Sequence, residues 1–279
     1  MFYMALWKDF ELDCTTHLNK NFGKYAGFIH QGGADSTVPD ILVRAVSGHV
    51  FYIEAKHSPA QCGQFVLLPN VETHSFEYSK QNVSRINEWS ETIITYMNKY
   101  FDEFREAGTS GKDIILDNDQ YIFSNWIIDY NKNKNVKFVI TNDYNIVTIE
   151  KFSDYFEISA KYRIKKSGSS SLGKSKVATY AKFLSSDRAY NHYNITGVRI
   201  EGNKLFVSSN IELHKQRFKL RFIDKTSADK NCEYMFSARG NEYEVRKLSN
   251  TNNANVIFSI KLKNHIQGLS NEDFINRLR

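Results

Sequence analysis

The stretch of sequence that decides the fold spans residues 39–56 and reads PDILVRAVSGHVFYIEAK. It contains two apolar runs, residues 41–46 and 50–55, separated by the short segment 47–49, whose middle residue is glycine. Two apolar runs joined by a short segment that contains glycine are typical of a β-hairpin. The stretch therefore predicts two antiparallel strands at the start of a sheet.

Three ionisable residues lie at the open end of this predicted hairpin. Asp40 precedes the first strand, and Glu54 and Lys56 end the second. Because alternate residues of a strand point to one face, Glu54 and Lys56 share a face. A two-residue loop would turn Asp40 to the opposite face, whereas a three-residue loop at 47–49 pairs Leu42 with Glu54 and brings all three groups together. We therefore expect the longer loop or an equivalent bulge.

Two carboxylates beside a lysine are the groups that a Mg²⁺-dependent phosphodiester hydrolase requires. Mg²⁺ prefers oxygen ligands and keeps several waters, so Asp40 and Glu54 are the expected metal ligands, with the Ala55 carbonyl as a further one. Lys56 would orient or help to deprotonate the attacking water and would offset charge in the transition state. In the alternative interpretation, Asp40 caps a loop, and Glu54 and Lys56 form a solvated strand edge.

Two more residues are candidates for catalysis. Glu11 lies at the margin of the apolar stripe of a predicted helix, from which it could point along the sheet toward the acids. Gln64, together with Gln61, lies in a predicted polar turn after Lys56, where an amide could hold a phosphate or the water. A solvated glutamate and ordinary turn chemistry are the respective alternatives.

Composition restricts the class of protein. The chain has 279 residues, 14% of them aromatic and only 3 of them Pro, which favours a folded chain with a buried core. Its net charge of +6 mildly favours a polyanionic partner. The three cysteines, Cys14, Cys62 and Cys232, lack the spacing of a zinc site or a disulfide framework. With no signal peptide and no membrane-length apolar run in this sequence, we expect a cytoplasmic protein.

Periodicity predicts further elements along the chain. Leu6, Phe10, Cys14 and Leu18 recur every four positions and predict a helix over residues 4–22. The remaining predicted elements are helices at 80–107, 122–130 and about 175–184, strands at 28–30, 136–141, 146–149, 197–200, 204–207 and 256–261, and a polar loop at 249–255.

At these residues the chain resembles the PD-(D/E)XK nuclease superfamily, and within it the HhaI-like type II restriction endonucleases. Pro39 and Asp40, with Glu54-Ala55-Lys56, match the superfamily signature. The resemblance is carried at both ends of the chain by Trp7-Lys8, Phe10-Glu11, Leu18-Asn19-Lys20, Asp35-Ser36-Thr37, Tyr52 to Lys56, Gln61 to Phe65, Tyr162 to Ser169 and Ser249 to Lys263.

The resemblance implies a Mg²⁺-dependent enzyme that cuts double-stranded DNA at a short palindrome, with GCGC as the implied target, in a restriction-modification system. A cognate methyltransferase would act on the same site without forming a stable complex. Two other interpretations stay open: a repair or junction nuclease with the same core, and a DNA-binding protein without catalytic activity.

The expected fold is α/β (α+β), a restriction-endonuclease-like core with a central mixed β-sheet flanked by helices. Residues 1–157 would form the catalytic domain, and residues 158–174 and 248–279 the DNA-recognition region. The resemblance does not extend over residues 175–247, so this segment is expected to be an inserted accessory DNA-binding domain. Its basic run, which fits backbone contact or a solvated strand, comprises His214, Lys215, Arg217, Lys219, Arg221 and Lys225.

Residues near the two ends of the accessory segment are candidates for reading DNA. Arginine and lysine donate to guanine O6 and N7, and short amides and hydroxyls bond base edges or phosphates. An ordinary polar turn is the alternative for the asparagine-rich segment. The predicted DNA-binding residues are Arg163, Lys165, Lys166, Ser167, Ser169, Asn250, Asn252, Asn253 and Asn255.

Overall fold

The structure is a computed structural model of the whole chain. It describes residues 6–32, 38–166, 168–186, 191–219, 233–249, 252–264 and 267–279. The chain divides into two compact units, a first unit of residues 1–164 with 254–279 and a second unit of residues 165–253. The second unit is thus inserted between two strands of the first, and it includes parts of both predicted recognition segments as well as the predicted accessory segment.

One sheet of the first unit carries the predicted hairpin. Three of its four strand pairs are antiparallel, while β3 and β7 run parallel, so the sheet is mixed as predicted. The strands lie in the order β1 (Ala26–His30), β2 (Ile41–Ala45), β3 (Val50–Ala55), β7 (Val136–Ile140) and β8 (Ile146–Thr148).

This sheet is buried on both faces. Helices α1 (Leu6–Phe22) and α8 (Asn271–Leu278) pack on one face and contact each other through Phe22 and Phe274. There the apolar residues of β2 and β3 meet Cys14, Leu18 and Phe274. Helix α4 (Asp119–Asn133) packs against β7 on the other face. Alternating apolar residues of β7 belong to the two cores in turn, as a strand covered on both faces requires.

The β2–β3 hairpin has a three-residue loop, but not the predicted one. The loop is Val46-Ser47-Gly48: the Ala45 N–H donates to the His49 carbonyl at 2.9 Å, and the Gly48 N–H donates to the Ala45 carbonyl at 2.9 Å. Gly48 has a φ of 91°, a backbone conformation that glycine adopts without steric cost. Gly48, which adopts the left-handed backbone conformation, is therefore the last residue of the loop.

The expected pairing of Leu42 with Glu54 is consequently wrong, because Leu42 pairs with Tyr52. The register is displaced by two residues relative to the prediction. Since side chains alternate with a period of two, this displacement leaves every residue on its predicted face. Asp40 still shares a face with Glu54 and Lys56.

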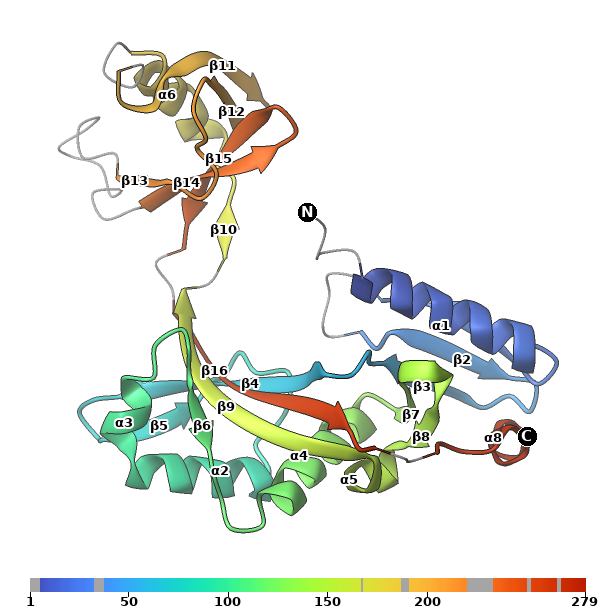
Figure 1. Cartoon of the computed structure of the whole chain (residues 1–279). Coiled ribbons are helices and arrows are strands. Elements are labelled where there is room, and N and C mark those ends of the chain that lie inside the picture. Colours follow the sequence, from blue (N-terminus) through green and yellow to red (C-terminus); the bar gives the residue numbers. More distant parts are fainter. Residues whose placement is uncertain are drawn as a thin grey trace. The chain divides into compact units, whose positions relative to one another are not determined.

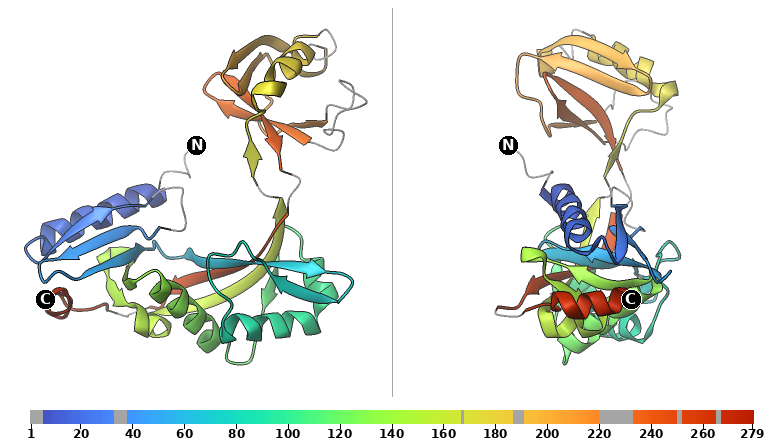
Figure 2. Two further views of the ribbon diagram at one scale, coloured as in Figure 1. Left: turned by 180° about the vertical axis from the view of Figure 1, so that it is seen from behind. Right: turned by 90° about the vertical axis from the view of Figure 1, so that its right-hand side faces the viewer.

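A second sheet lies beside the first, and the long strands β4, β16 and β9 run side by side in it (Figures 1 and 2). Phe65, Trp126, Phe258 and other aromatic residues form its core with the helices. Its strands, in order, are β5 (Ser75–Tyr78), β4 (Ala60–Asn70), β16 (Asn252–Leu262), β9 (Phe156–Lys166) and β6 (Lys112–Ile114). The connecting helices and turns are α2 (Glu88–Lys99), α3 (Phe101–Arg105), η1 (Asn142–Tyr144), η2 (Ile149–Lys151) and α5 (Phe152–Tyr155).

Two predicted elements differ in this region. The helix expected over 80–107 begins only at Glu88, because Asn87 caps it and accepts a bond from the Ser90 N–H, and it breaks at Tyr100. The polar loop expected at 249–255 is a strand from Asn252 onward, because β16 pairs with β4 and β9 and so forms a strand despite its asparagines.

The second unit contains a third sheet, covered on one face by α6 (Lys174–Leu184), which confirms the helix predicted there. The predicted strands near 197–200 and 204–207 are also present. The strand order is β11 (Ile195–Glu201), β12 (Lys204–Ser209), β15 (Glu242–Leu248), β14 (Glu233–Arg239) and β13 (Arg217–Lys219), and β10 (Ser169–Ser170) also pairs with β15. Among the residues that the structure describes, no helix combines the length and apolar character of a membrane span.

Candidate active site

The structure brings together the two acids and the lysine of the quoted stretch. The Lys56 Nζ lies 3.0 Å from the Asp40 Oδ2 and 2.5 Å from the Glu54 Oε2. The side chains of Asp40, Glu54 and Lys56 are only 13%, 11% and 21% exposed. The predicted alternative, a solvated strand edge, does not describe such a buried cluster.

Backbone hydrogen bonds fix Asp40 at the start of β2. Its carbonyl accepts bonds from the N–H groups of Gln31 and Gly32 at 2.8 and 3.1 Å. Its Oδ2 accepts a bond from the Ala55 N–H at 2.9 Å. The Asp40 carboxylate is therefore tied to the strand that carries Glu54, through the residue that follows Glu54.

The end of β7 holds Lys56. The Lys56 N–H donates to the Ile140 carbonyl at 2.9 Å, and the Thr141 hydroxyl donates to the Lys56 carbonyl at 2.7 Å. Because β3 and β7 are parallel, their carboxyl ends meet at one edge of the sheet, and the cluster lies there. The sequence pattern of β3 alone contains no signal for these partners.

The segment after Lys56 is also fixed, by residues that the sequence did not single out. The Asn142 side chain accepts a bond from the Ser58 N–H at 2.7 Å and donates to the Ser58 carbonyl at 3.0 Å. The Ser58 hydroxyl accepts a bond from the Leu262 N–H at 2.7 Å. These bonds join β3, β7 and β16 directly behind the lysine, so its backbone has little freedom to move.

Burial and charge act in opposite directions on the cluster. Burial raises the pKa of Glu54, and the nearby Lys56 ammonium opposes that rise. Burial would lower the pKa of Lys56, but the carboxylates of Glu54 and Asp40 outweigh it and hold this pKa above its usual value. Lys56 is therefore an ammonium at neutral pH and neutralises the buried acids.

The donor atoms of the cluster suit a hard cation. Carboxylate and carbonyl oxygens are the ligands that Mg²⁺ takes, and two carboxylates leave positions for water and phosphate. Within the described residues, no three His, Cys, Asp or Glu side chains gather as a metal-binding group. Burial raises the pKa of Cys14 to about 12 and also raises that of Cys62, so neither thiol is a ready thiolate ligand.

Glu11 is buried but contacts a different partner. Its Oε2 lies 3.1 Å from the His30 Nε2, and α1 packs on the sheet face opposite the one that Asp40, Glu54 and Lys56 share. The structure shows no hydrogen bond from Glu11 to the three. His30 neighbours the loop that bonds the Asp40 backbone, so Glu11 lies behind the site rather than in the ion-pair cluster.

The polar turn predicted around Gln61 and Gln64 is wrong, because both residues lie in strand β4. Opposite Phe258 and Ser259 the register shifts and Cys62 is an additional residue, which forms a β-bulge. The bulge places both glutamines on one side, where the Gln61 Nε2 donates to the Gln64 Oε1 at 3.1 Å. Both side chains are exposed.

Two predicted DNA-binding residues carry buried polar atoms without a partner. The Arg163 Nε and the Asn255 Oδ1 have no hydrogen bond, and Asn255 is buried. They lie on neighbouring strands, β9 and β16, close to the points where the chain leaves and re-enters the first unit. Buried polar atoms are normally paired, so these two atoms are exceptions among the described residues.

The other predicted DNA-binding residues are placed differently. Lys165, Asn252 and Asn253 are exposed, and Ser169 is partly buried. The Ser169 hydroxyl accepts a bond from the Arg246 Nε at 2.8 Å. Lys166 ends β9, and the structure describes only its backbone; Ser167 and Asn250 lie outside the described residues.

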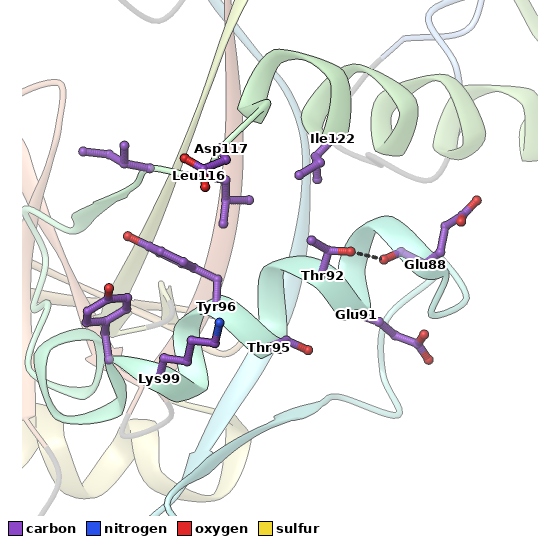
Figure 3. Close-up of a pocket in the computed structure, with 11 residues that line it drawn as sticks. Glu88, Glu91, Thr92, Thr95, Tyr96, Lys99, Leu116, Asp117 and Ile122 are labelled. Atoms are coloured by element: carbon purple, nitrogen blue, oxygen red, sulfur yellow. Dashed lines mark hydrogen bonds between the residues drawn. The ribbon is translucent and has the colours of Figure 1, made fainter.

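A pocket of about 740 Å³ lies elsewhere in the first unit (Figure 3). Its lining comes from α2 and from the segment that leads into α4, and it includes Glu88, Glu91 and Asp117. None of the cluster residues line it. Its acidic character would repel a phosphate, so we do not assign it to the site.

Comparison with known proteins agrees with this geometry. No family model matches the chain, and no curated protein matches it. A solved structure does: an HhaI endonuclease in complex with DNA is 39% identical, the match covers 94% of this chain and 93% of that one, and the TM-score is 0.74. The chain belongs to the HhaI endonuclease family. The resemblance predicted from the sequence is thus confirmed.

The family match extends beyond the two ends of the chain that the sequence resemblance covered. Only a small share of either chain lies outside the match, and this share is far smaller than residues 175–247. The structural match therefore also reaches into this segment, where the sequence resemblance was not traced. Both units belong to the shared architecture.

The charge balance of the cluster generates a stability prediction. Replacing Lys56 with methionine leaves two buried carboxylates unneutralised, which should destabilise the metal-free protein by about 3 kcal/mol near pH 8. Burial already raises the pKa of Glu54, and Lys56 is one of the groups that lower it. The variant therefore loses stability as pH rises through that raised pKa, and the loss should shrink toward pH 5.

Urea unfolding in EDTA, followed by tryptophan fluorescence between pH 5 and 8, measures this difference. The exposed Lys99→Met substitution is the matched control and should change little at any pH. A Lys56→Met variant as stable as the parent, or a loss that does not depend on pH, would contradict this account of the cluster.

Proposed function

We propose that the chain is a Mg²⁺-dependent type II restriction endonuclease that hydrolyses phosphodiester bonds of double-stranded DNA at a short palindromic site. The observation that carries the proposal is the convergence of Asp40, Glu54 and Lys56 in one buried cluster. Membership of the HhaI endonuclease family supports it. GCGC is the proposed target, taken from the family resemblance.

In this proposal the site is a PD-(D/E)XK centre. The carboxylates of Asp40 and Glu54 and the carbonyl of Ala55 would hold Mg²⁺. When bound, the ion supplies charge stabilisation at the phosphate and a more acidic water. The oxygen-only donor set fits this ion better than zinc, which prefers nitrogen and sulfur ligands.

Lys56 would stabilise charge rather than accept a proton. Its carboxylate neighbours raise its pKa, so the side chain remains an ammonium and is a poor base. Once the two acids bind the cation, the ammonium no longer has to neutralise them and becomes available to the phosphate and the attacking water. Fixed charge aimed at a developing negative charge is the larger contribution in such sites.

Glu11 and Gln64 have supporting roles in the proposal. Glu11 would act through His30, which neighbours the loop bonded to the Asp40 backbone. Gln64 would use its exposed amide, oriented by Gln61, to hold a phosphate oxygen or the water. Both therefore position groups around the acids.

DNA contact is assigned to the two strands that connect the units. The unpaired Arg163 Nε and Asn255 Oδ1 are the atoms that a base edge would satisfy, with arginine suited to guanine O6 and N7. Phosphate or base contact is further proposed for Lys165, Lys166, Ser167, Ser169, Asn250, Asn252 and Asn253. Of these, Ser169 already supports Arg246 through its hydroxyl.

Restriction of DNA places the enzyme in the cytoplasm in this proposal, with a cognate methyltransferase that modifies the same site and forms no stable complex. A repair or junction nuclease and a non-catalytic DNA-binding protein are the competing functions. Each of the three functions gives a different result in a plasmid cleavage assay.

Purified protein with Mg²⁺ and a plasmid should yield discrete fragments on a gel. A non-catalytic DNA-binding protein cannot give such fragments. A junction nuclease would give them only from branched DNA. Lys56→Ala should reduce the cleavage rate by a factor of about a hundred to a thousand or more, because a preorganised charge at the phosphate is lost. Cognate binding in Ca²⁺ should remain.

The exposed Lys99→Ala variant is the control and should cut as the parent does. Cleavage confined to branched DNA would support a repair or junction nuclease, and retention without cleavage would support the binding protein. Lost cognate binding in Lys56→Ala would refute the division between binding and catalysis.

Arg163→Ala tests base recognition. If the guanidinium donates to a base, the substitution should weaken cognate binding by about 1–3 kcal/mol and reduce the preference over non-cognate duplexes. Fluorescence anisotropy with both duplexes in Ca²⁺ measures this, with Arg105→Ala as a control in α3. An unchanged preference would exclude Arg163 from base recognition.

A further inference from the structure

The sheet of the second unit has one face that α6 does not cover. Tyr234, Phe236 and Val245 point to the core with α6. The register of β14 and β15 pairs Ser237 with Glu244, so these residues and their alternate neighbours lie on the outer face. The outer face therefore carries Arg239, Glu244 and Arg246.

Glu244 is the centre of a polar cluster on this face. Its side chain is only 3% exposed, although it lies on the outer face. Its Oε2 accepts bonds from the Arg239 Nε at 3.2 Å and the Arg246 Nη1 at 3.3 Å, and its Oε1 accepts one from the Ser171 hydroxyl at 3.1 Å. Burial opposes ionisation, but these partners lower the pKa of Glu244, so it is a carboxylate.

Arg246 and Arg239 differ in how many of their guanidinium N–H groups are already hydrogen-bonded. Arg246 is 23% exposed and donates to Glu244 and, through Nε and Nη2, to the hydroxyl and carbonyl of Ser169. Arg239 is 53% exposed and, within the described residues, donates only through its Nε. Its two Nη groups remain to donate outside the cluster.

Exposed basic residues continue from Arg239 along the edge of the sheet. The His214 Nδ1 accepts a bond from the Ala238 N–H at 3.1 Å, the Lys215 N–H donates to the Phe236 carbonyl at 2.8 Å, and Arg217 pairs with Met235. His214, Lys215 and Arg217 are all exposed. They therefore lie in sequence along β14 and end beside Arg239.

The neighbouring positions of the outer face carry balanced charge: Glu242 pairs with Arg239 in the register of β14 and β15, and its carboxylate bonds Arg199. Arg199 is bonded by both Glu242 and Glu201, with its Nη2 at 2.7 Å from the Glu242 Oε2. Around Glu244, by contrast, two arginines share one buried carboxylate. The charge available to a polyanion is thus concentrated at Arg239 and the β13 edge.

We propose that Arg239 binds a backbone phosphate of duplex DNA, that Glu244 is the positioning residue that orients it, and that the exposed residues His214, Lys215 and Arg217 extend the same sequence-independent surface. The partner follows from the proposed function, whereas the assignment of these residues follows from the geometry above. A guanidinium held at Nε presents two N–H groups to a phosphate in fixed geometry, and little rotamer entropy is lost on binding.

Glu244→Gln separates positioning from simple charge. The substitution adds one positive charge to the face, so charge alone predicts tighter binding to DNA. If Glu244 orients Arg239, the variant should instead bind a non-cognate duplex about threefold to tenfold more weakly, with a salt slope smaller by about 0.9. Glu201→Gln is the matched control, because it makes the same charge change beside Arg199 and Glu201 does not pair with Arg239.

Fluorescence anisotropy of the full chain in Ca²⁺ across a series of KCl concentrations gives both quantities. Weaker binding of Glu244→Gln with unchanged or tighter binding of Glu201→Gln supports the proposal. Equal behaviour of the two variants overturns it.

Arg239→Gln provides a second variant at an exposed position, in case Glu244→Gln does not fold by circular dichroism. It should lower affinity for cognate and non-cognate duplexes alike and reduce the salt slope by about 0.9, whereas Arg199→Gln should change the slope much less. Equal effects of both arginine variants, or a loss limited to cognate DNA, overturn the phosphate assignment. Plasmid cleavage by the parent is scored separately, so the proposed function and this surface can fail independently.

Discussion

The ion pair between Lys56 and the two acids is the interaction on which the site depends. Two carboxylates placed this close would repel each other, and burial strengthens the repulsion by removing water. The ammonium lies within 3.0 Å of both and offsets that repulsion. A protein that needs two adjacent carboxylates for a cation can therefore fold before the cation binds. In the proposed mechanism, the lysine stabilises the free protein and becomes available to the substrate phosphate once the acids bind the cation.

The backbone supplies the precision that the ion pair needs. Gly48 fixes where the hairpin turns, and the parity of that turn keeps Asp40 on the face of Glu54. The parallel neighbour β7 then holds the lysine backbone through Ile140 and Thr141. Lys56 lies far from Ile140 and Thr141 in the sequence. The site therefore forms only when the mixed sheet has assembled. The short motif of Asp40, Glu54 and Lys56 is common as a sequence pattern, and it forms a site only in a fold that brings the three side chains together.

Local pattern was enough to predict the hairpin, the face shared by the three ionisable residues, and helices such as α6. It was not enough where the secondary structure of a segment depends on the strand with which it pairs. Gln61 and Gln64 look like a turn because they are polar, yet β16 pairs with them and makes them a bulged strand. The asparagines before Ala254 look like a loop for the same reason. The predicted loop register was wrong because the sequence alone does not tell whether Gly48 is the middle or the last residue of the loop.

The cluster around Glu244 shows a second limit of sequence reasoning. Glu244 and Arg246 are two apart on a strand, which indicates a shared face but neither burial nor function. Only the register of β14 and β15 and the return of β10 to β15 reveal that Ser169, Ser171 and both arginines meet there. In both units, then, a buried carboxylate and a cation are paired beside groups proposed to contact DNA. The nearness of opposite charges limits the cost of burying each.

The most direct test of the central claim is calorimetric titration of Ca²⁺ into the protein bound to cognate DNA, comparing the parent with Asp40→Asn and Glu54→Gln. Ca²⁺ takes the same oxygen ligands as Mg²⁺. If the two acids together hold the ion, each substitution should weaken ion binding at least about tenfold, which corresponds to the loss of one charged ligand worth about 1.4 kcal/mol or more. Ion affinity and stoichiometry unchanged in both variants would contradict the assignment of the site.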